Sequence, residues 1–291
     1  MTSSDETSTR GDRPAGLRNA AATYTGEVVP TVDAASVLVV RDGTDAPEVL
    51  LVERHGRADF AGGAFVFPGG KVSDADRDLD ATRYAGVDPA AWARRLGTDG
   101  PRDALGLLVA AVRETFEEAG ILLAHRKGRP LSPDEVVSPG FVHMREQLSD
   151  RSTDTDWRGW LDDEDLVLDL GALELWAWWV TPEGQHKRFD TRFFVARLPD
   201  GQSAHHDDVE TTALRWADPT WALGEQAAGR AKIIFPTRRI LASLATFEDA
   251  ASAIAAAAAG KVDQRRIQPR LERRGDQMWV HHPYDGTAER I

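Results

Sequence analysis

Residues 113–120 read Arg-Glu-Thr-Phe-Glu-Glu-Ala-Gly, and the interpretation of the whole chain depends on this stretch. Glu114, Glu117 and Glu118 stand at i, i+3 and i+4, which places three carboxylates on one face of an α-helix. Like charges at this spacing destabilise a helix by a few tenths of a kcal/mol (roughly 0.2–0.5) per pair. A hard divalent cation would compensate for this repulsion, because it is held by carboxylate oxygens and substrate phosphates. Taken alone, a solvated acidic face with Arg113 paired to Glu117 explains the pattern better.

The acidic stretch lies at the end of an amphipathic helix. Pro101 stands near the expected start of this helix and Gly120 at its expected end. Apolar residues repeat at helical spacing between them, which buries one face and leaves the three glutamates off it. These apolar residues are Leu105, Leu108, Val109, Val112 and Phe116.

Residues 67–71, Phe-Pro-Gly-Gly-Lys, favour a functional site over a solvated surface for the acidic face. They follow a short strand predicted at 64–67, and the two glycines permit close backbone approaches that other residues do not. Upstream, 32–40 and 49–52 are apolar, β-branched runs on either side of a turn at 41–45, which predicts a β-hairpin.

The remaining chain alternates between strand and helix signals. This order indicates a mixed sheet with helices on its faces, an α/β or α+β sandwich. Further strands are predicted at 173–180, 189–198, 212–216 and 278–280, and helices at about 89–96, 141–148, 221–226, 236–244 and 250–259.

The chain divides into three parts. Residues 1–25 are small and polar and predict a disordered tail. Residues 26–245 form the expected domain, with an insertion at about 73–102 and a mixed helix and loop insertion at about 128–168. Residues 246–291 are an expected helical and irregular extension.

Composition narrows the function. The 291 residues include 42% apolar and 28% charged residues, as in ordinary globular proteins. The net charge of −12 argues against general nucleic-acid binding, and the absence of cysteine leaves only oxygen and histidine ligands for a metal. No apolar run approaches the roughly 18 residues of a membrane span, and residues 1–15 lack the apolar core of a signal peptide. We therefore expect a cytoplasmic protein.

Gly70 and the run from Arg113 to Ile121 resemble the box of the Nudix (MutT-type) hydrolase superfamily, Gly-x5-Glu-x7-Arg-Glu-U-x-Glu-Glu-x-Gly-U, with U a bulky apolar residue. The C-terminal half fits throughout, with Phe116 beside Thr115 at the apolar position. The pattern has 13 residues between its glycine and arginine, whereas this chain has 42 (71 to 112), an excess of 29. Counting back eight residues from Arg113 places the first glutamate of the box at Leu105.

An interrupted box preceded by Phe-Pro-Gly-Gly is similar to the branch of the superfamily that includes the peroxisomal coenzyme A diphosphatases. Residues 179–182 and 188–194 also resemble this branch, and the resemblance covers roughly residues 30–245. It implies a Nudix-type α/β/α sandwich with a mixed sheet and a loop-helix-loop catalytic box.

The resemblance also implies roles for the residues of the box. Glu114, Glu117 and Glu118 would be catalytic and would bind Mg²⁺ or Mn²⁺ together with the Gly69 carbonyl, and Arg113 would orient the glutamates by ion pairing. The metal would neutralise a diphosphate and lower the pKa of the attacking water.

Many members of the superfamily add a glutamate from a later loop as base or ligand. Glu210 is the candidate here, and a solvated loop acid is the alternative; Asp207 and Asp208 are weaker candidates. His205 and His206 are adjacent on the same loop, so we expect them to be solvated rather than to form a second metal site.

Substrate-binding residues are expected before and within the Pro-Gly-Gly turn. The coenzyme A branch has Leu-Leu-x-x-Arg followed by Gly-x3-Phe-Pro-Gly-Gly, which matches here at Arg54, Phe67 and Gly70, with an intermediate arginine displaced to Arg57. For Arg54, an ordinary surface position is the alternative to phosphate binding. The tryptophans of 173–180 are expected to pack in the core, with adenine stacking as the alternative. Strand alternation predicts Trp176 and Trp178 on one face and Trp179 on the other.

We therefore predict metal-dependent hydrolysis of a diphosphate bond in a nucleoside diphosphate derivative, with coenzyme A or acyl-coenzyme A as the leading substrate. ADP-ribose, a dinucleotide or a related compound is one alternative. A non-catalytic Nudix-fold nucleotide sensor is the other, because a first glutamate is missing at Leu105. The expected partner is a small molecule, not nucleic acid or a membrane, and the sequence leaves a homodimer open.

Overall fold

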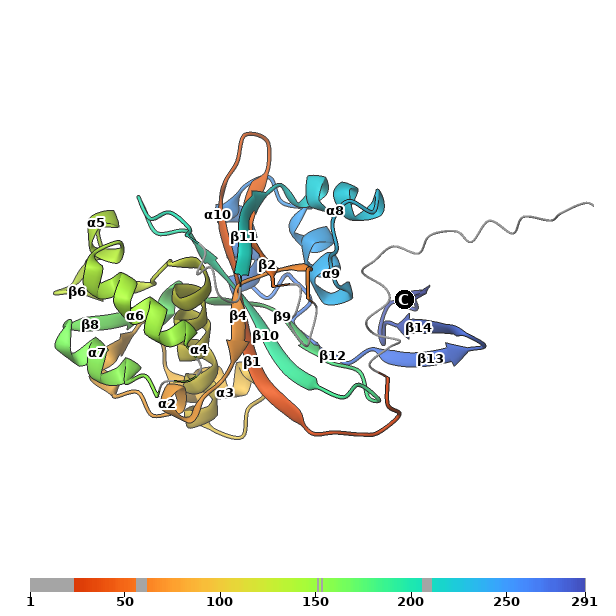
Figure 1. Ribbon diagram of the computed structural model, residues 1–291, viewed down its shortest axis with the longest axis horizontal. Coiled ribbons are helices and arrows are strands. Elements are labelled where there is room, and N and C mark those ends of the chain that lie inside the picture. The colour runs from red at the N-terminus through yellow and green to blue at the C-terminus, as the bar shows by residue number, and fades with distance from the viewer. Residues whose placement is uncertain (1–23, 56–61, 151, 153, 206–210, 291) are drawn as a thin grey trace, which may run out of the picture.

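An eight-stranded mixed β-sheet forms the centre of the molecule (Figure 1). The computed structural model describes residues 24–55, 62–150, 152, 154–205 and 211–290. The strand order is β11-β2-β1-β10-β9-β12, with β3 paired to β2 and β4 to β1. The strands are β1 (Thr31–Asp42), β2 (Pro47–Arg54), β3 (Phe65–Val66), β4 (Gly69–Lys71), β9 (Glu174–Val180), β10 (Arg188–Arg197), β11 (Thr211–Ala217) and β12 (Arg266–Ile267).

Strand β1 sets the position of the site. It pairs in parallel with β10 along one edge, from Thr31 to Val40. Along its other edge it pairs with β4 at residues 34–36 and with β2 at residues 40–42, which confirms the predicted hairpin. Gly69 and Gly70 therefore lie against the middle of β1, where its neighbour changes from β4 to β2.

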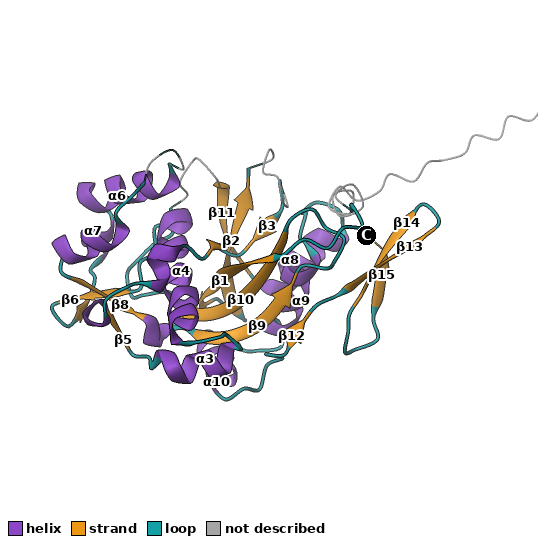
Figure 2. Ribbon diagram, turned by 90° about the horizontal axis from the view of Figure 1, so that it is seen from below, coloured by secondary structure: helices purple, strands orange, loops and turns teal. Residues whose placement is uncertain are grey.

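Helices cover both faces of the sheet, because β1 and its neighbours alternate apolar side chains to either side (Figures 1 and 2). One face packs against α4 (Pro101–Ala119) and α3 (Pro89–Leu96). The other packs against α8 (Pro219–Ala227), α9 (Phe235–Leu244) and α10 (Ala250–Ala258). The predicted α/β sandwich with a mixed sheet is confirmed.

The two expected insertions pack against each other. Together with β6, which precedes the second insertion, they form a four-stranded sheet, β5-β8-β6-β7, beside α4, so the expectation of helix and loop alone was wrong. Leu166 and Leu168 are fully buried and alternate with partly exposed residues, a strand signal in a short segment. The elements are α2 (Asp74–Arg77), η2 (Ala81–Arg83), β5 (Tyr84–Ala85), β6 (Ala124–Arg126), β7 (Arg129–Pro130), α5 (Pro133–Val136), α6 (Pro139–Ser149), α7 (Trp157–Asp163), β8 (Leu166–Asp169) and η3 (Leu170–Ala172).

The C-terminal extension is more regular than expected. Strand β12 joins the central sheet beside β9, and β13 (Arg270–Arg274), β14 (Gln277–His281) and β15 (Ala288–Arg290) form an antiparallel sheet that projects from the body (Figure 2). At the other end, residues 1–23 of the predicted tail lie outside the described residues, and the backbone N–H of Thr25 donates to the Gly184 carbonyl.

Within the described part of the chain, no helix has the length and apolar character needed to cross a membrane.

Candidate active site

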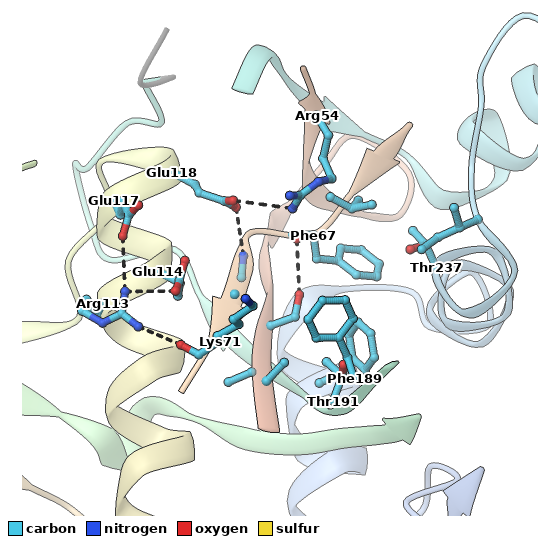
Figure 3. Close-up of a pocket in the computed structure, with 18 of the residues that line it drawn as sticks. Arg54, Phe67, Lys71, Arg113, Glu114, Glu117, Glu118, Phe189, Thr191 and Thr237 are labelled. Atoms are coloured by element: carbon cyan, nitrogen blue, oxygen red, sulfur yellow. Dashed lines mark hydrogen bonds and ion pairs between the residues drawn. The ribbon is translucent and has the colours of Figure 1, made fainter. Parts of the chain in front are cut away.

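A cavity of about 440 Å³ opens where β4 and β2 meet beside β1 (Figure 3). Carboxylates of α4 line one wall, and the glycines of β4 lie beside them. The opposite wall is mostly apolar and comes from β10, the start of α9 and the residue that follows β3. Its residues include Phe67, Phe189, Thr191, Phe193, Ile234 and Thr237.

Helix α4 delivers three glutamates to this cavity from its last turns. Glu117 and Glu118 are 7% and 2% exposed, so their carboxylates face the protein interior rather than bulk solvent. Glu118 Oε2 accepts a hydrogen bond from the Gly69 N–H at 2.9 Å, and Oε1 lies 4.0 Å from Arg54 Nη1. The alternative interpretation, a solvated acidic face, is therefore wrong.

The Pro-Gly-Gly turn is fitted closely against both β1 and α4. The Ser36 hydroxyl donates to the Pro68 carbonyl at 2.8 Å and so fixes the turn to β1. A β-carbon at Gly70 would lie 2.5 Å from both carboxylate oxygens of Glu114, and one at Gly69 would clash with the Ala35 carbonyl. Only glycine permits this approach of the turn to the acidic helix.

Arg113 forms ion pairs with two of the cavity carboxylates and with a third carboxylate, Asp76. Its Nε and Nη2 donate to Asp76 Oδ1 and Oδ2 at 2.8 and 3.0 Å, a bidentate pair. Its Nη1 lies 2.9 Å from Glu114 Oε1 and 3.3 Å from Glu117 Oε2, and Nη2 also donates to the Lys71 carbonyl. Burial would lower the pKa of Arg113, but Glu114, Asp76 and Glu117 outweigh it and raise that pKa above its ordinary value.

Asp76 supports the acidic wall and is not among the residues predicted from the sequence. Its side chain is fully buried, and it stands six residues after Gly70, the position of the first glutamate in the family pattern. Counting forward from Gly70 finds it, whereas counting back from Arg113 crosses the inserted residues and ends at Leu105. Leu105 is buried in the core, and the nearest acidic residue in the sequence, Asp103, pairs with Arg77. The extra residues of the box therefore follow Asp76, later than the expected start at 73.

Two predicted site residues cannot be placed, because Arg57 and Glu210 lie outside the described residues. His206, Asp207 and Asp208 lie there too. Arg54 does line the cavity, and its Nε is buried with no hydrogen-bond partner among the described residues. Phe67 contacts the cavity from a buried position and packs edge-on against Phe193.

None of the three tryptophans of β9 lines the cavity, and two of them are buried in the core, whereas Trp178 is only partly buried. Trp176 and Trp179 are buried in the same cluster, on the face covered by α8, α9 and α10. We expected them on opposite faces, but a bulge in the pairing of β9 with β10 shifts the alternation. Trp178 Nε1 donates to Asp190, and its ring lies under the Arg192 guanidinium.

The donor set of the cavity suits a hard divalent cation. Glu114, Glu117 and Glu118 offer only oxygen ligands, which Mg²⁺ and Mn²⁺ prefer. Among the residues that the structure describes, no three acidic or histidine side chains already converge into a metal site. Arg113 Nη1 lies between Glu114 and Glu117, so the carboxylates are held near one another by an arginine.

Comparison with known proteins gives consistent matches. The sequence model of the NUDT19 Nudix domain matches residues 87–236. The human acyl-coenzyme A diphosphatase NUDT19 is 30% identical over 204 residues, 60% of this chain and 54% of that protein. Its Gallus gallus counterpart is 31% identical over 215 residues, 60% of this chain and 55% of that protein. The chain thus spans about half the length of these curated relatives.

A solved structure agrees with the sequence matches. The crystal structure of a Nudix hydrolase from Alicyclobacillus acidocaldarius aligns with a TM-score of 0.60 and 29% identity, covering 78% of this chain and 96% of that one. The sheet and the helices on its faces are therefore shared with a protein of known structure.

Proposed function

Because the chain belongs to the NUDT19 Nudix domain family, we propose that it is a metal-dependent diphosphohydrolase whose substrate is a nucleoside diphosphate derivative. Members of the Nudix superfamily generally use divalent metal ions. The observation that carries the proposal is the placement of the three α4 glutamates and the Gly69-Gly70 turn on one cavity wall. Hydrolysis of a diphosphate needs oxygen ligands beside a space for phosphates, and this wall offers both.

We assign roles to the residues around this wall. Glu114, Glu117 and Glu118, with the Gly69 carbonyl, would hold Mg²⁺ or Mn²⁺, which supplies charge neutralisation and an activated water. Arg113 keeps Glu114 and Glu117 in position through the contacts of its Nη1.

The phosphates would lie near Arg54. Its Nε is buried without a hydrogen-bond partner among the described residues, and Nη1 is 4.0 Å from Glu118, so the guanidinium lies beside the expected metal position. A phosphate oxygen would satisfy the buried donor. Lys71, exposed at the cavity edge, adds a second positive charge.

Coenzyme A or an acyl-coenzyme A is the proposed substrate. The wall opposite the glutamates presents Phe67, Phe189, Phe193 and Ile234, a surface suited to an adenine ring or an apolar chain rather than to a sugar. The matched relatives are named as acyl-coenzyme A diphosphatases, which supports this choice.

The test is a panel of coenzyme A, acyl-coenzyme A, ADP-ribose and dinucleotides, each with Mg²⁺ or Mn²⁺, with products identified by mass. We expect coenzyme A compounds to be cleaved at the diphosphate, into adenosine bisphosphate and a phosphopantetheine. Cleavage of ADP-ribose or a dinucleotide alone would replace this substrate assignment. Binding without hydrolysis of any compound would indicate a nucleotide sensor.

Glu117→Gln and Glu118→Gln should lower kcat by about 10²–10³-fold, since each removes a metal ligand and its charge stabilisation. Glu146→Gln, on the exposed side of α6, is the matched control and should keep wild-type kcat. Full metal-dependent activity in either site variant would contradict the proposal.

A further inference from the structure

The C-terminal end of α4 is held by groups from outside the helix. The last four carbonyls of any helix lack partners within it. In α4, the Gly120 N–H donates a hydrogen bond to the Phe116 carbonyl at 2.9 Å, and the His205 N–H donates one to the Ala119 carbonyl at 2.8 Å. The two carbonyls between them belong to Glu117 and Glu118, the buried carboxylate residues of the cavity wall.

One guanidinium binds both of these carbonyls. Arg145, on α6, donates from Nε to the Glu117 carbonyl at 2.8 Å and from Nη2 to the Glu118 carbonyl at 3.1 Å. It packs against Gly120, where a β-carbon would lie 3.1 Å from Nη1. The positive charge stands at the negative end of the helix dipole, which strengthens both bonds.

Arg145 also joins the helix end to a second segment. Its Nη2 donates to the His205 carbonyl, so the same side chain holds α4 and the loop at 202–205 together. Gln202 reinforces this arrangement with a pair of bonds to the backbone N–H and carbonyl of Leu122, at 3.0 and 3.1 Å. The last turn of α4 is thus fixed through its main chain, which leaves the glutamate side chains facing the cavity.

We propose that Arg145 is a positioning residue for the metal-binding glutamates, acting through the carbonyls of Glu117 and Glu118. The inference rests on the proposed function, because it concerns the residues that would hold the metal. It gives the insertion at about 128–168, whose helix α6 carries Arg145, a role in the reaction. Without the guanidinium, the last turn of α4 loses two hydrogen bonds and frays, and the two carboxylates no longer keep fixed positions.

The experiment compares Arg145→Met and Arg145→Lys with the wild-type protein. Arg158→Met is the matched control, because Arg158 lies on α7 of the same insertion and contacts the Asp78 carbonyl instead of α4. Binding of Mn²⁺ without substrate is measured by electron paramagnetic resonance of the free ion. Amide hydrogen exchange over 117–121 reports the helix end, and kcat and KM are measured in parallel.

We expect Arg145→Met to weaken Mn²⁺ binding by about 10–100-fold, the usual effect of removing a group that orients metal ligands. Exchange over 117–121 should accelerate and kcat should fall, while KM changes less. Arg145→Lys keeps the positive charge but cannot bind both carbonyls at once. Its Mn²⁺ affinity should therefore lie between those of the wild-type protein and Arg145→Met. If Arg145→Met does not fold, the lysine variant carries the same comparison.

Either of two results would overturn the role of Arg145 without contradicting the proposed function. One is wild-type Mn²⁺ affinity in Arg145→Met; the other is an equal loss of Mn²⁺ affinity in Arg158→Met, which would indicate a general effect on stability. A wild-type protein that neither binds Mn²⁺ nor hydrolyses any substrate would instead overturn the proposed function.

Discussion

At the scale of single residues, the buried pair of Asp76 and Arg113 organises the acidic wall. Asp76 is fully buried and accepts from Arg113 through both oxygens and from the Ser73 N–H at 2.8 Å. Because these bonds use the Nε edge of the guanidinium, its Nη1 is directed at Glu114 and Glu117. A carboxylate outside the cavity thus fixes the orientation of two inside it.

Replacing Asp76 should therefore lower the stability of the protein. Asp76→Asn leaves a buried arginine with less compensating charge, and we expect the free energy of unfolding to fall by about 3 kcal/mol. Asp103→Asn is the control, because Asp103 pairs with Arg77 at a partly exposed position and should cost less than about 1 kcal/mol. Urea denaturation measures the unfolding free energy of both variants, and equal losses in the two would contradict a special role for the buried pair.

At the scale of elements, the end of α3 shows how the first insertion is attached to the sheet. Arg192, from β10, donates to the Leu96 carbonyl through Nε and Nη2, at 3.2 and 2.9 Å, and lies over the ring of Trp178. Burial lowers the pKa of Arg192, and nearby Asp190 opposes this shift. Gly97 ends α3 in the left-handed conformation (φ 62°), and the Trp178 ring occupies the space that a side chain at this position would need.

A side chain at Gly97 should loosen this attachment. In Gly97→Ala the new β-carbon would lie 2.6 Å from the Trp178 ring in a backbone conformation that alanine disfavours, so we expect a loss of about 2 kcal/mol in unfolding free energy. Gly100→Ala is the control, since nothing lies within 4 Å of a β-carbon there and its backbone is extended. Thermal denaturation of the two variants decides the matter, and similar midpoints would contradict this account.

At the scale of the whole molecule, the C-terminal extension contains part of the core. Ala250, Ala253, Ala257 and Ile267 belong to the apolar cluster on the face that α8 and α9 also cover. The domain boundary expected at 245 therefore divides a layer of helices that pack together on one face of the sheet.

Truncation tests this directly. A chain ending at 245 loses α10 and β12 and should unfold at a much lower denaturant concentration, since Ile267 alone contributes about 1.5–3 kcal/mol by burial. A chain ending at 268 keeps both elements and loses only the projecting sheet, so its midpoint should stay closer to that of the full chain. The reverse order of stability would show that the projecting sheet carries more of the folding energy than its packing indicates.

The family, the mixed α/β fold and the acidic helix can all be predicted from the sequence. These depend on local signals: the helical spacing of Leu105 to Phe116, the glutamates that follow, the two glycines of the turn and the apolar runs of β1 and β2. Such signals are carried by residues a few positions apart, so they survive an insertion elsewhere in the chain.

The distant residues that contact the acidic helix could not be predicted from the sequence. Asp76 lies 37 residues before Arg113 and Arg145 lies 28 after Glu117, and no local pattern links either pair. Likewise, the strand pairing of β8 and β12 depends on partners far along the chain. Contacts of this kind depend on how the helices and the sheet pack. The sequence therefore predicts the acidic helix, but the residues that hold it in place are seen only in the folded protein.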